Sequence, residues 1–206
     1  SGYFFGSSVQ RHSLGEVICS RFTKVLLPIF VWTTFVTLLY EVLQFVRTHQ
    51  LDITVASMIR SYRTEQWFLW AVFWCSMTVL VLHIVCRDHI WAYVAVWVIL
   101  PFALSGSQAQ LYEFMYPYFA VGYLCNIKGK RLQTGDRMLL YFIPLVLLYV
   151  GCLYFFDSED FIYTTGIKVS AENFPRQLGI DYFRWAMGFV GSGVCMTAIK
   201  AFADRK

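Results

Sequence analysis

The sequence predicts an all-α protein, a multi-pass transmembrane helical bundle with about six full spans and the end of a preceding helix. Apolar residues make up 58% of the 206 residues and charged residues only 15%, whereas soluble domains contain roughly 45–50% and about 25%. Aromatic residues reach 19%, which suits rings that lie at membrane interfaces and between helices. A soluble core could not bury this much apolar surface in so short a chain.

Six apolar windows reach or approach the length of about 20 residues that a helix needs to cross the hydrocarbon layer. The third and fourth windows are short and contain Pro101 and Pro117, so we expect a kink or a re-entrant excursion at each. Residues 1–5 are expected to end a further helix. The predicted spans are residues 25–46, 67–86, 90–105, 112–127, 138–156 and 182–202.

The positive charges in the connections predict the orientation in the membrane. Of 17 Lys and Arg residues, 11 fall in alternate connections on one side and five on the other, and Arg184 lies inside the last span. The side with 11 is therefore predicted to be cytoplasmic, and the acidic connection 157–181 to lie outside. The lipid bilayer is thus an expected partner. Nucleic acid is not, because the chain has no basic run of the kind that binds it.

A polar stripe follows one face of the first full span. Thr34, Thr37, Glu41 and Gln44 recur at intervals of three and four residues, which places them on one helical face. A carboxylate within the bilayer costs about 2.5–3.5 kcal/mol on insertion scales, so Glu41 should face the bundle interior or water. The stripe lines a substrate passage, or Glu41 makes an interhelical hydrogen bond or reaches the outer interface; the sequence leaves these readings open.

Residues of the second and fourth spans are further candidates for the same passage. Glu65 precedes the second span at the predicted outer surface, and Trp67 opens a stripe of aromatic residues that is otherwise typical of packing. In the fourth span, Glu113 lies at the outer end with Tyr116 one turn further on. In the last span, Arg184 either clamps an anionic or hydroxyl-rich substrate or extends its side chain to the lipid headgroups.

Two groups of residues near the predicted cytoplasmic surface could hold ligands. Arg21 and Lys24 are expected at the start of a helix, where cationic side chains and unpaired backbone N–H groups suit phosphates. An ordinary positive flank of a membrane helix explains the same charges. The spacing of His83, Cys86 and His89 resembles a metal site, but the sequence offers no fourth ligand in a fixed motif, so we expect no metal.

Five segments occur in order along nearly the whole chain: SGYFF, RFTKVLLPIFVW, EQWFLWAVF, MYPYFAVGYL and YFRWAMGFVGS. Taken together, they resemble the membrane-bound acyltransferase family 3 of bacterial O-acyltransferases. Each segment alone is a loose pattern, so the specificity of the resemblance lies in the ordered set. We therefore expect residues 1–206 to form a single transmembrane acyltransferase-like domain that is truncated at both ends.

The resemblance implies transfer of an acyl group, usually acetyl, from cytoplasmic acyl-CoA to a hydroxyl of an outward-facing glycan or lipid-linked sugar. It places the protein in the bacterial inner membrane, with acetyl-CoA or another acyl-CoA as donor substrate and no bound cofactor. In this interpretation Arg21 and Lys24 would hold the CoA phosphates. The alternatives are a non-catalytic membrane subunit and a transporter-like protein for a polysaccharide precursor.

The resemblance also implies where the general base lies. Members of the family carry a base His, with an Arg upstream of it, on the membrane helix that precedes the SGYFF segment. His12 follows this segment and His49 lies in an outer connection, so neither matches that position. We therefore expect the catalytic His to lie outside these residues, and the chain to be an internal fragment that binds without turnover.

Overall fold

The structure, a computed structural model, describes residues 2–48, 59, 62, 67–103, 107–128, 137–170 and 172–203. Every regular element within these ranges is a helix, which confirms the all-α class. The elements are α1 (Gly2–Arg11), α2 (Leu14–Arg21), the π-helical turn η1 (Phe22–Leu26), α3 (Leu27–Thr48), α5 (Trp67–Cys86), α6 (Ile90–Ala103), α7 (Ser107–Ile127), α8 (Arg137–Phe155), the 3₁₀ turn η2 (Ser158–Asp160), α9 (Ile162–Thr165) and α10 (Arg176–Ala203).

The helices coincide with the predicted windows, and several extend beyond them. α5 has the predicted bounds, whereas α10 begins at Arg176 and α7 at Ser107. Within the described residues, the helices Leu14–Thr48 and Phe68–Cys86 are long and apolar enough to cross a membrane. The apolar helices Ile90–Ala103 and Tyr141–Phe155 are shorter. A bundle of six spans therefore stays a prediction.

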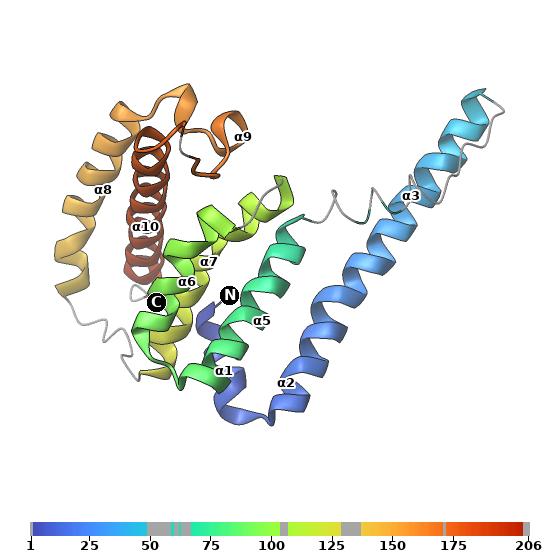
Figure 1. The fold of residues 1–206 in the computed structure, drawn as a ribbon, viewed down its shortest axis with the longest axis horizontal. Coiled ribbons are helices and arrows are strands. Elements are labelled where there is room, and N and C mark those ends of the chain that lie inside the picture. Colours follow the sequence, from blue (N-terminus) through green and yellow to red (C-terminus); the bar gives the residue numbers. More distant parts are fainter. Residues whose placement is uncertain are drawn as a thin grey trace.

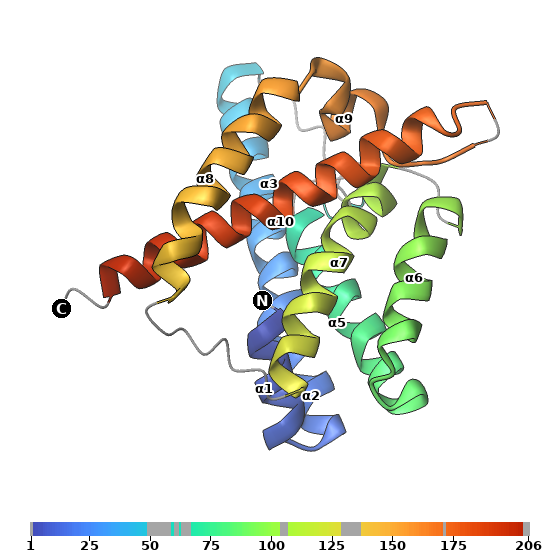
Figure 2. The ribbon, with the colours of Figure 1, turned by 90° about the vertical axis from the view of Figure 1, so that its left-hand side faces the viewer.

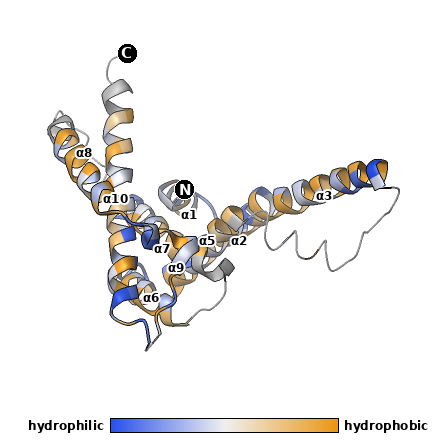
Figure 3. Cartoon of the chain, turned by 90° about the horizontal axis from the view of Figure 1, so that it is seen from above, coloured by the Kyte–Doolittle hydropathy of each residue, from blue (hydrophilic) through white to orange (hydrophobic). Residues whose placement is uncertain are grey.

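The helix α7 lies at the centre of the fold, with α1 and α5 packed against it (Figures 1 and 2). The buried core between these helices includes Phe5, Val79, Tyr116 and Tyr123. A second contact joins α8 to α10. The helix α3 extends away from the other elements, and apolar side chains cover much of its surface (Figures 1 and 3).

Glycines allow α1 to approach α7 closely. A Cβ atom built on Gly2 would lie 2.0 Å from the carbonyl oxygen of Phe119, and one built on Gly122 would lie 3.1 Å from the backbone nitrogen of Tyr3. Small residues at such crossings let two helix backbones touch. Here they let residues 2–5 of the SGYFF segment pack directly on α7.

The turn between α5 and α6 joins three helices through one carboxylate. Asp88 Oδ2 lies 2.8 Å from His83 Nδ1, and its Oδ1 accepts hydrogen bonds from the hydroxyls of Tyr93 (2.8 Å) and Tyr123 (3.3 Å). His83 therefore has a carboxylate partner. Among the described residues, no group of three His, Cys, Asp or Glu is arranged to hold a metal ion.

The connections fall at two ends of the molecule. The α1–α2 turn, the α5–α6 turn and the end of α7 lie together at the lower end in Figures 1 and 2. The end of α3, α9 and the beginning of α10 lie at the opposite end. The lower end carries connections that the charge count predicts to be cytoplasmic. We call these the predicted cytoplasmic and outer ends.

Part of the acidic outer connection is folded against the bundle. Ile167 and Val169 are buried, and the Val169 N–H donates to the carbonyl of Pro101 at the end of α6 (3.3 Å). The acidic composition of connection 157–181 is typical of a solvated segment. The structure differs because the apolar side chains of Ile167 and Val169, on either side of Lys168, are both buried.

Candidate functional site

A pocket of about 270 Å³ lies at the predicted cytoplasmic end, where α1 turns into α2. It brings Arg21 and Lys24 together with polar side chains of both helices. Two of its residues, Glu16 and His12, face each other across 3.6 Å. The pocket is lined by Ser8, His12, Glu16, Val17, Ser20, Arg21 and Lys24.

A capping box shapes one wall of this pocket. The Ser13 hydroxyl accepts a hydrogen bond from the backbone N–H of Glu16 (3.4 Å), and the Glu16 carboxylate accepts one from the N–H of Ser13 (3.0 Å). This reciprocal pairing satisfies the first turn of α2. The Glu16 carboxylate is thereby engaged by the backbone of Ser13, while Arg21 and Lys24 supply two positive charges to the same pocket.

Arg21 connects the pocket to the SGYFF segment. Its guanidinium group lies over the ring of Phe5, 4.6 Å from the ring centroid. Phe5 is itself buried against Phe119 and Tyr123 of α7, with ring centroids 5.6 and 5.9 Å away. A cation above an aromatic face is attracted by about 0.5–2 kcal/mol. The SGYFF and RFTKVLLPIFVW segments thus meet at one contact.

The helix that carries Arg21 and Lys24 starts earlier than predicted. Its first residue is Leu14, and α2, η1 and α3 continue without a break to Thr48. The expected unpaired N–H groups therefore lie near residue 14 and not beside Arg21. Within this helix Lys24 sits in the π-helical turn η1, a local widening that is frequent at functional sites. The side chains, not the helix start, supply the positive charge.

The predicted passage residues fall in different environments. Glu41 is buried, with 8% of its surface exposed, and its Oε2 has no hydrogen-bond partner among the described residues. The buried hydroxyl oxygens of Thr33 and Thr37 also have no hydrogen-bond partner among the described residues. The buried polar face therefore includes Thr33, where the sequence suggested Thr34. Glu65 and the side chain of Trp67 lie outside the described residues.

Glu113 and Tyr116 both lie buried on α7. The Tyr116 hydroxyl donates to the carbonyl of Tyr93 (3.4 Å) and so joins α7 to α6. Both carboxylate oxygens of Glu113 lack a partner within the described part of the chain. Tyr116 thus has a visible packing role, whereas Glu113 has unused hydrogen-bonding capacity.

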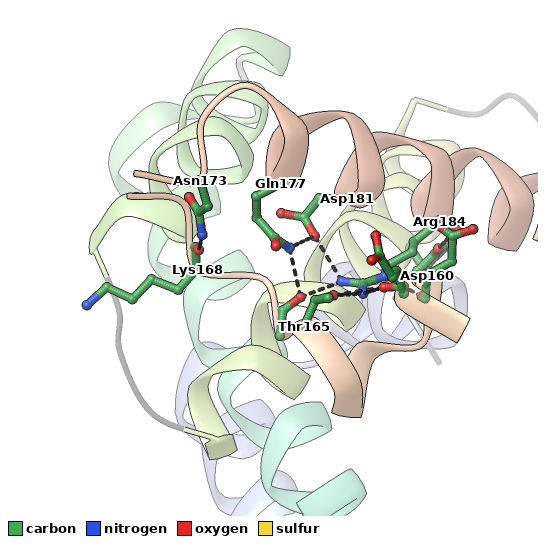
Figure 4. Close-up of polar contacts among 10 residues, drawn as sticks. Asp160, Thr165, Lys168, Asn173, Gln177, Asp181 and Arg184 are labelled. Carbon is green, nitrogen blue, oxygen red and sulfur yellow. Dashed lines mark hydrogen bonds and ion pairs between the residues drawn. The ribbon is translucent and has the colours of Figure 1, made fainter. Parts of the chain in front are cut away.

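Arg184 anchors the outer connection (Figure 4). Its guanidinium group donates to the carbonyls of Asp160 and Gly166, to the carbonyl of Glu159 (3.0 Å), and to the hydroxyl of Thr165. It also pairs with Asp181 Oδ1 at 3.0 Å. These are five acceptors for the five N–H groups of one guanidinium. A direct contact between Arg184 and a substrate therefore stays a prediction, while its structural role is visible.

The sequence profile of a family described as "Acyltransferase domain" matches residues 1–206 of the chain. The chain belongs to acyltransferase family 3. It is also similar to the nodulation protein NolL of Mesorhizobium japonicum, with 24% identity over 203 residues, which are 97% of this chain and 53% of NolL. The chain thus spans about half the length of this relative. No solved structure matches it.

The structure adds residues to this acyltransferase family 3 chain that sequence reasoning did not select. Phe5 lies under Arg21, and His12 and Glu16 line the pocket. Asp181 pairs with Arg184. Two of these pairs have a local signal: Asp181 lies three residues before Arg184, and Glu16 lies four residues after His12 and closes a capping box with Ser13. The contact of Phe5 with Arg21 depends on how α1 packs along α7, which no short pattern reveals.

Proposed function

We propose that this chain is part of a bacterial inner-membrane O-acyltransferase. It would move an acyl group, acetyl in the first instance, from cytoplasmic acyl-CoA to a hydroxyl of an extracytoplasmic glycan or lipid-linked sugar. The observation that carries the proposal is the pocket in which Arg21 and Lys24 lie together beside the SGYFF segment. Membership of acyltransferase family 3 supports the reaction class.

The composition of the pocket suits the phosphates of CoA. Arg21 offers a planar fork of donors that matches phosphate oxygens, and Lys24 adds a mobile point charge. The Phe5 ring under Arg21 restrains the guanidinium before a ligand arrives. A group that is held in place loses less entropy on binding. We therefore assign Arg21 and Lys24 to donor binding and Phe5 to the positioning of Arg21.

The proposed transfer needs one bond to form and one to break. The acceptor hydroxyl oxygen attacks the thioester carbonyl carbon, a C–O bond forms, and the C–S bond breaks. The hydroxyl proton passes to the general base, for which the resemblance implies the His ahead of SGYFF, and CoA leaves as a thiolate that takes up a proton. Proton transfer of this kind contributes about 10²–10⁴ in rate. In this proposal Glu41 and Glu113 line the passage for the acceptor.

Replacing Arg21 by Ala is expected to weaken acetyl-CoA binding about tenfold or more, because hydrogen bonds to charged groups contribute about 1.5–3 kcal/mol. Lys24→Ala should weaken it by a smaller factor, since Lys24 is exposed and its charge is screened. Isothermal titration calorimetry of the purified chain in detergent micelles measures both affinities.

The matched control is Lys128→Ala, which removes one exposed positive charge at the same end but outside the pocket. This variant should bind acetyl-CoA as tightly as the unaltered chain. Equal weakening by Lys128→Ala and Arg21→Ala would show general charge attraction and contradict the pocket assignment. If the unaltered chain is indifferent to acetyl-CoA, the proposal fails, and a non-catalytic subunit or a transporter-like protein becomes the better interpretation.

A further inference from the structure

Five buried polar atoms on α6, α7 and α10 have no hydrogen-bond partner among the described residues. They are Trp97 Nε1, both carboxylate oxygens of Glu113, Asp181 Oδ2 and Trp185 Nε1. Glu113 and Asp181 each expose 1% of their surface, and Trp185 exposes 3%. A buried acceptor or donor without a partner costs about 1–3 kcal/mol. We call Trp97, Glu113, Asp181 and Trp185 the α7–α10 polar cluster.

These residues lie close to one another although they come from three helices. The Tyr118 hydroxyl of α7 donates to the backbone carbonyls of Arg184 (3.5 Å) and Trp185 (3.3 Å) on α10, so the two helices touch within five residues of Glu113 and within four of Asp181. Trp185 follows Asp181 by four residues, which places both on one face of α10. The ring centroids of Trp97 and Trp185 are 5.2 Å apart. The unpaired donors and acceptors therefore belong to one place in the fold.

Asp181 is held rigidly within this cluster (Figure 4). Its Oδ1 accepts hydrogen bonds from Gln177 Nε2 (2.9 Å) and Arg184 Nη1 (3.0 Å). These two contacts fix the carboxylate and leave Oδ2 as the unpaired oxygen. The described donors of Arg184 end on Asp181 and on the outer connection. Arg184 therefore holds Asp181 in place but leaves Asp181 Oδ2 without a hydrogen-bond partner among the described residues.

The chemistry of the unpaired atoms favours a ligand that both donates and accepts hydrogen bonds. The carboxylates need a hydrogen-bond donor, whereas the two indole N–H groups need an acceptor. An ammonium group would satisfy only the carboxylates. A phosphate would satisfy only the indoles and would be repelled by Glu113 and Asp181. A hydroxyl group both donates and accepts, so a ligand with several hydroxyls satisfies both kinds of atom.

We propose that the α7–α10 polar cluster binds the hydroxyl groups of a sugar ring. This inference rests on the proposed function, because it names the part of the chain that meets the acceptor. The cluster is separate from the donor pocket. Asn126, which contacts Ser7 of α1, follows Glu113 by 13 residues on α7, a rise of about 20 Å. Donor and acceptor sites would then lie toward opposite ends of α7.

The test measures binding of methyl α-D-glucopyranoside to the full chain in detergent by saturation-transfer NMR. The unaltered chain should bind this probe saturably, and Glu113→Gln should weaken binding about tenfold or more, because an amide replaces a charged acceptor with similar shape. Trp185→Phe keeps an aromatic ring but removes the N–H donor and should weaken binding by a smaller factor. Glu172→Gln alters an exposed carboxylate of the outer connection and should leave binding unchanged.

Acetyl-CoA titration of the same preparations separates this inference from the proposed function. The inference is supported if Glu113→Gln loses the sugar probe but keeps its acetyl-CoA affinity and unfolding temperature. It is overturned if the variant binds the probe unchanged, if cyclohexylmethanol binds as well as the glucoside, or if only acetyl-CoA binds the unaltered chain. Binding of the glucoside without binding of acetyl-CoA would support the cluster as a sugar site and contradict the proposal that acyl-CoA is the donor.

Discussion

Replacement of Arg184 by Ala should lower the free energy of unfolding by about 3–5 kcal/mol, the cost of breaking a buried ion pair by removing one partner. The variant loses five hydrogen-bonding contacts at once. It also leaves the carboxylate of Asp181 buried without its positive partner. Unfolding of the purified chain in mixed micelles, followed by circular dichroism, measures the change.

The loss should begin in the outer connection. Arg184 joins α10 to the carbonyls of Glu159, Asp160 and Gly166 and to the hydroxyl of Thr165. Without these bonds, residues 157–166 keep few anchors on the bundle, and limited proteolysis should cut there before the helices unfold. Cleavage that begins instead within α5 or α7 would contradict this role for Arg184.

Arg176→Ala provides the control for this prediction. Arg176 pairs with Glu159 at the surface, and 73% of its side chain is exposed, so its removal should cost only about 0–1 kcal/mol. A second variant, Asp181→Asn with Arg184→Ala, removes the stranded charge and should recover part of the lost stability. If Arg184→Ala alters sugar binding while stability is unchanged, the substrate clamp predicted from the sequence is correct and the structural role is not.

The helices were predictable because hydropathy marks them directly. A run of about 20 apolar residues in a short chain is compatible with few structures other than a helix. The helix α5 has the predicted bounds. Helix ends were less predictable. α10 starts at Arg176, six residues before its apolar window, because a helix continues into polar sequence wherever its backbone bonds are satisfied. Hydropathy therefore locates the part suited to lipid and not the whole helix.

The donor pocket was predictable only in part. The spacing of Arg21 and Lys24 places both on one side of a helix, and the structure shows both lining one pocket. The contact of Arg21 with Phe5 depends on α1 folding back along α7. Tyr118 of α7 likewise meets the backbone carbonyls of Arg184 and Trp185 on α10 from a distant part of the sequence. These contacts join distant parts of the sequence. A local sequence pattern can therefore select a candidate residue, but it cannot predict which residue it will contact.

Replacement of Gly122 by Leu should lower the free energy of unfolding by about 3 kcal/mol, at the upper end for overpacking. A Cβ atom at this position already lies 3.1 Å from Tyr3 N and 3.6 Å from Gly2 Cα. A full Leu side chain has no room there, so α1 must move away from α7. Gly122→Ala should have a smaller effect, and unfolding in mixed micelles gives the order of the two.

The same displacement should reach the donor pocket. Phe5 lies on α1, under Arg21, so a shift of α1 removes the ring that restrains the guanidinium, and acetyl-CoA affinity should fall together with stability. Gly151→Leu on α8 is the control, because nothing lies within 4 Å of a Cβ atom there. It should leave acetyl-CoA affinity unchanged and should not lower stability, since only helix propensity acts at this position. Lost stability with unchanged affinity would mean that Arg21 binds the donor without help from Phe5. Unchanged stability would contradict the seating of α1 on α7, because Leu is the better helix former by roughly 0.8 kcal/mol and only the contact opposes it.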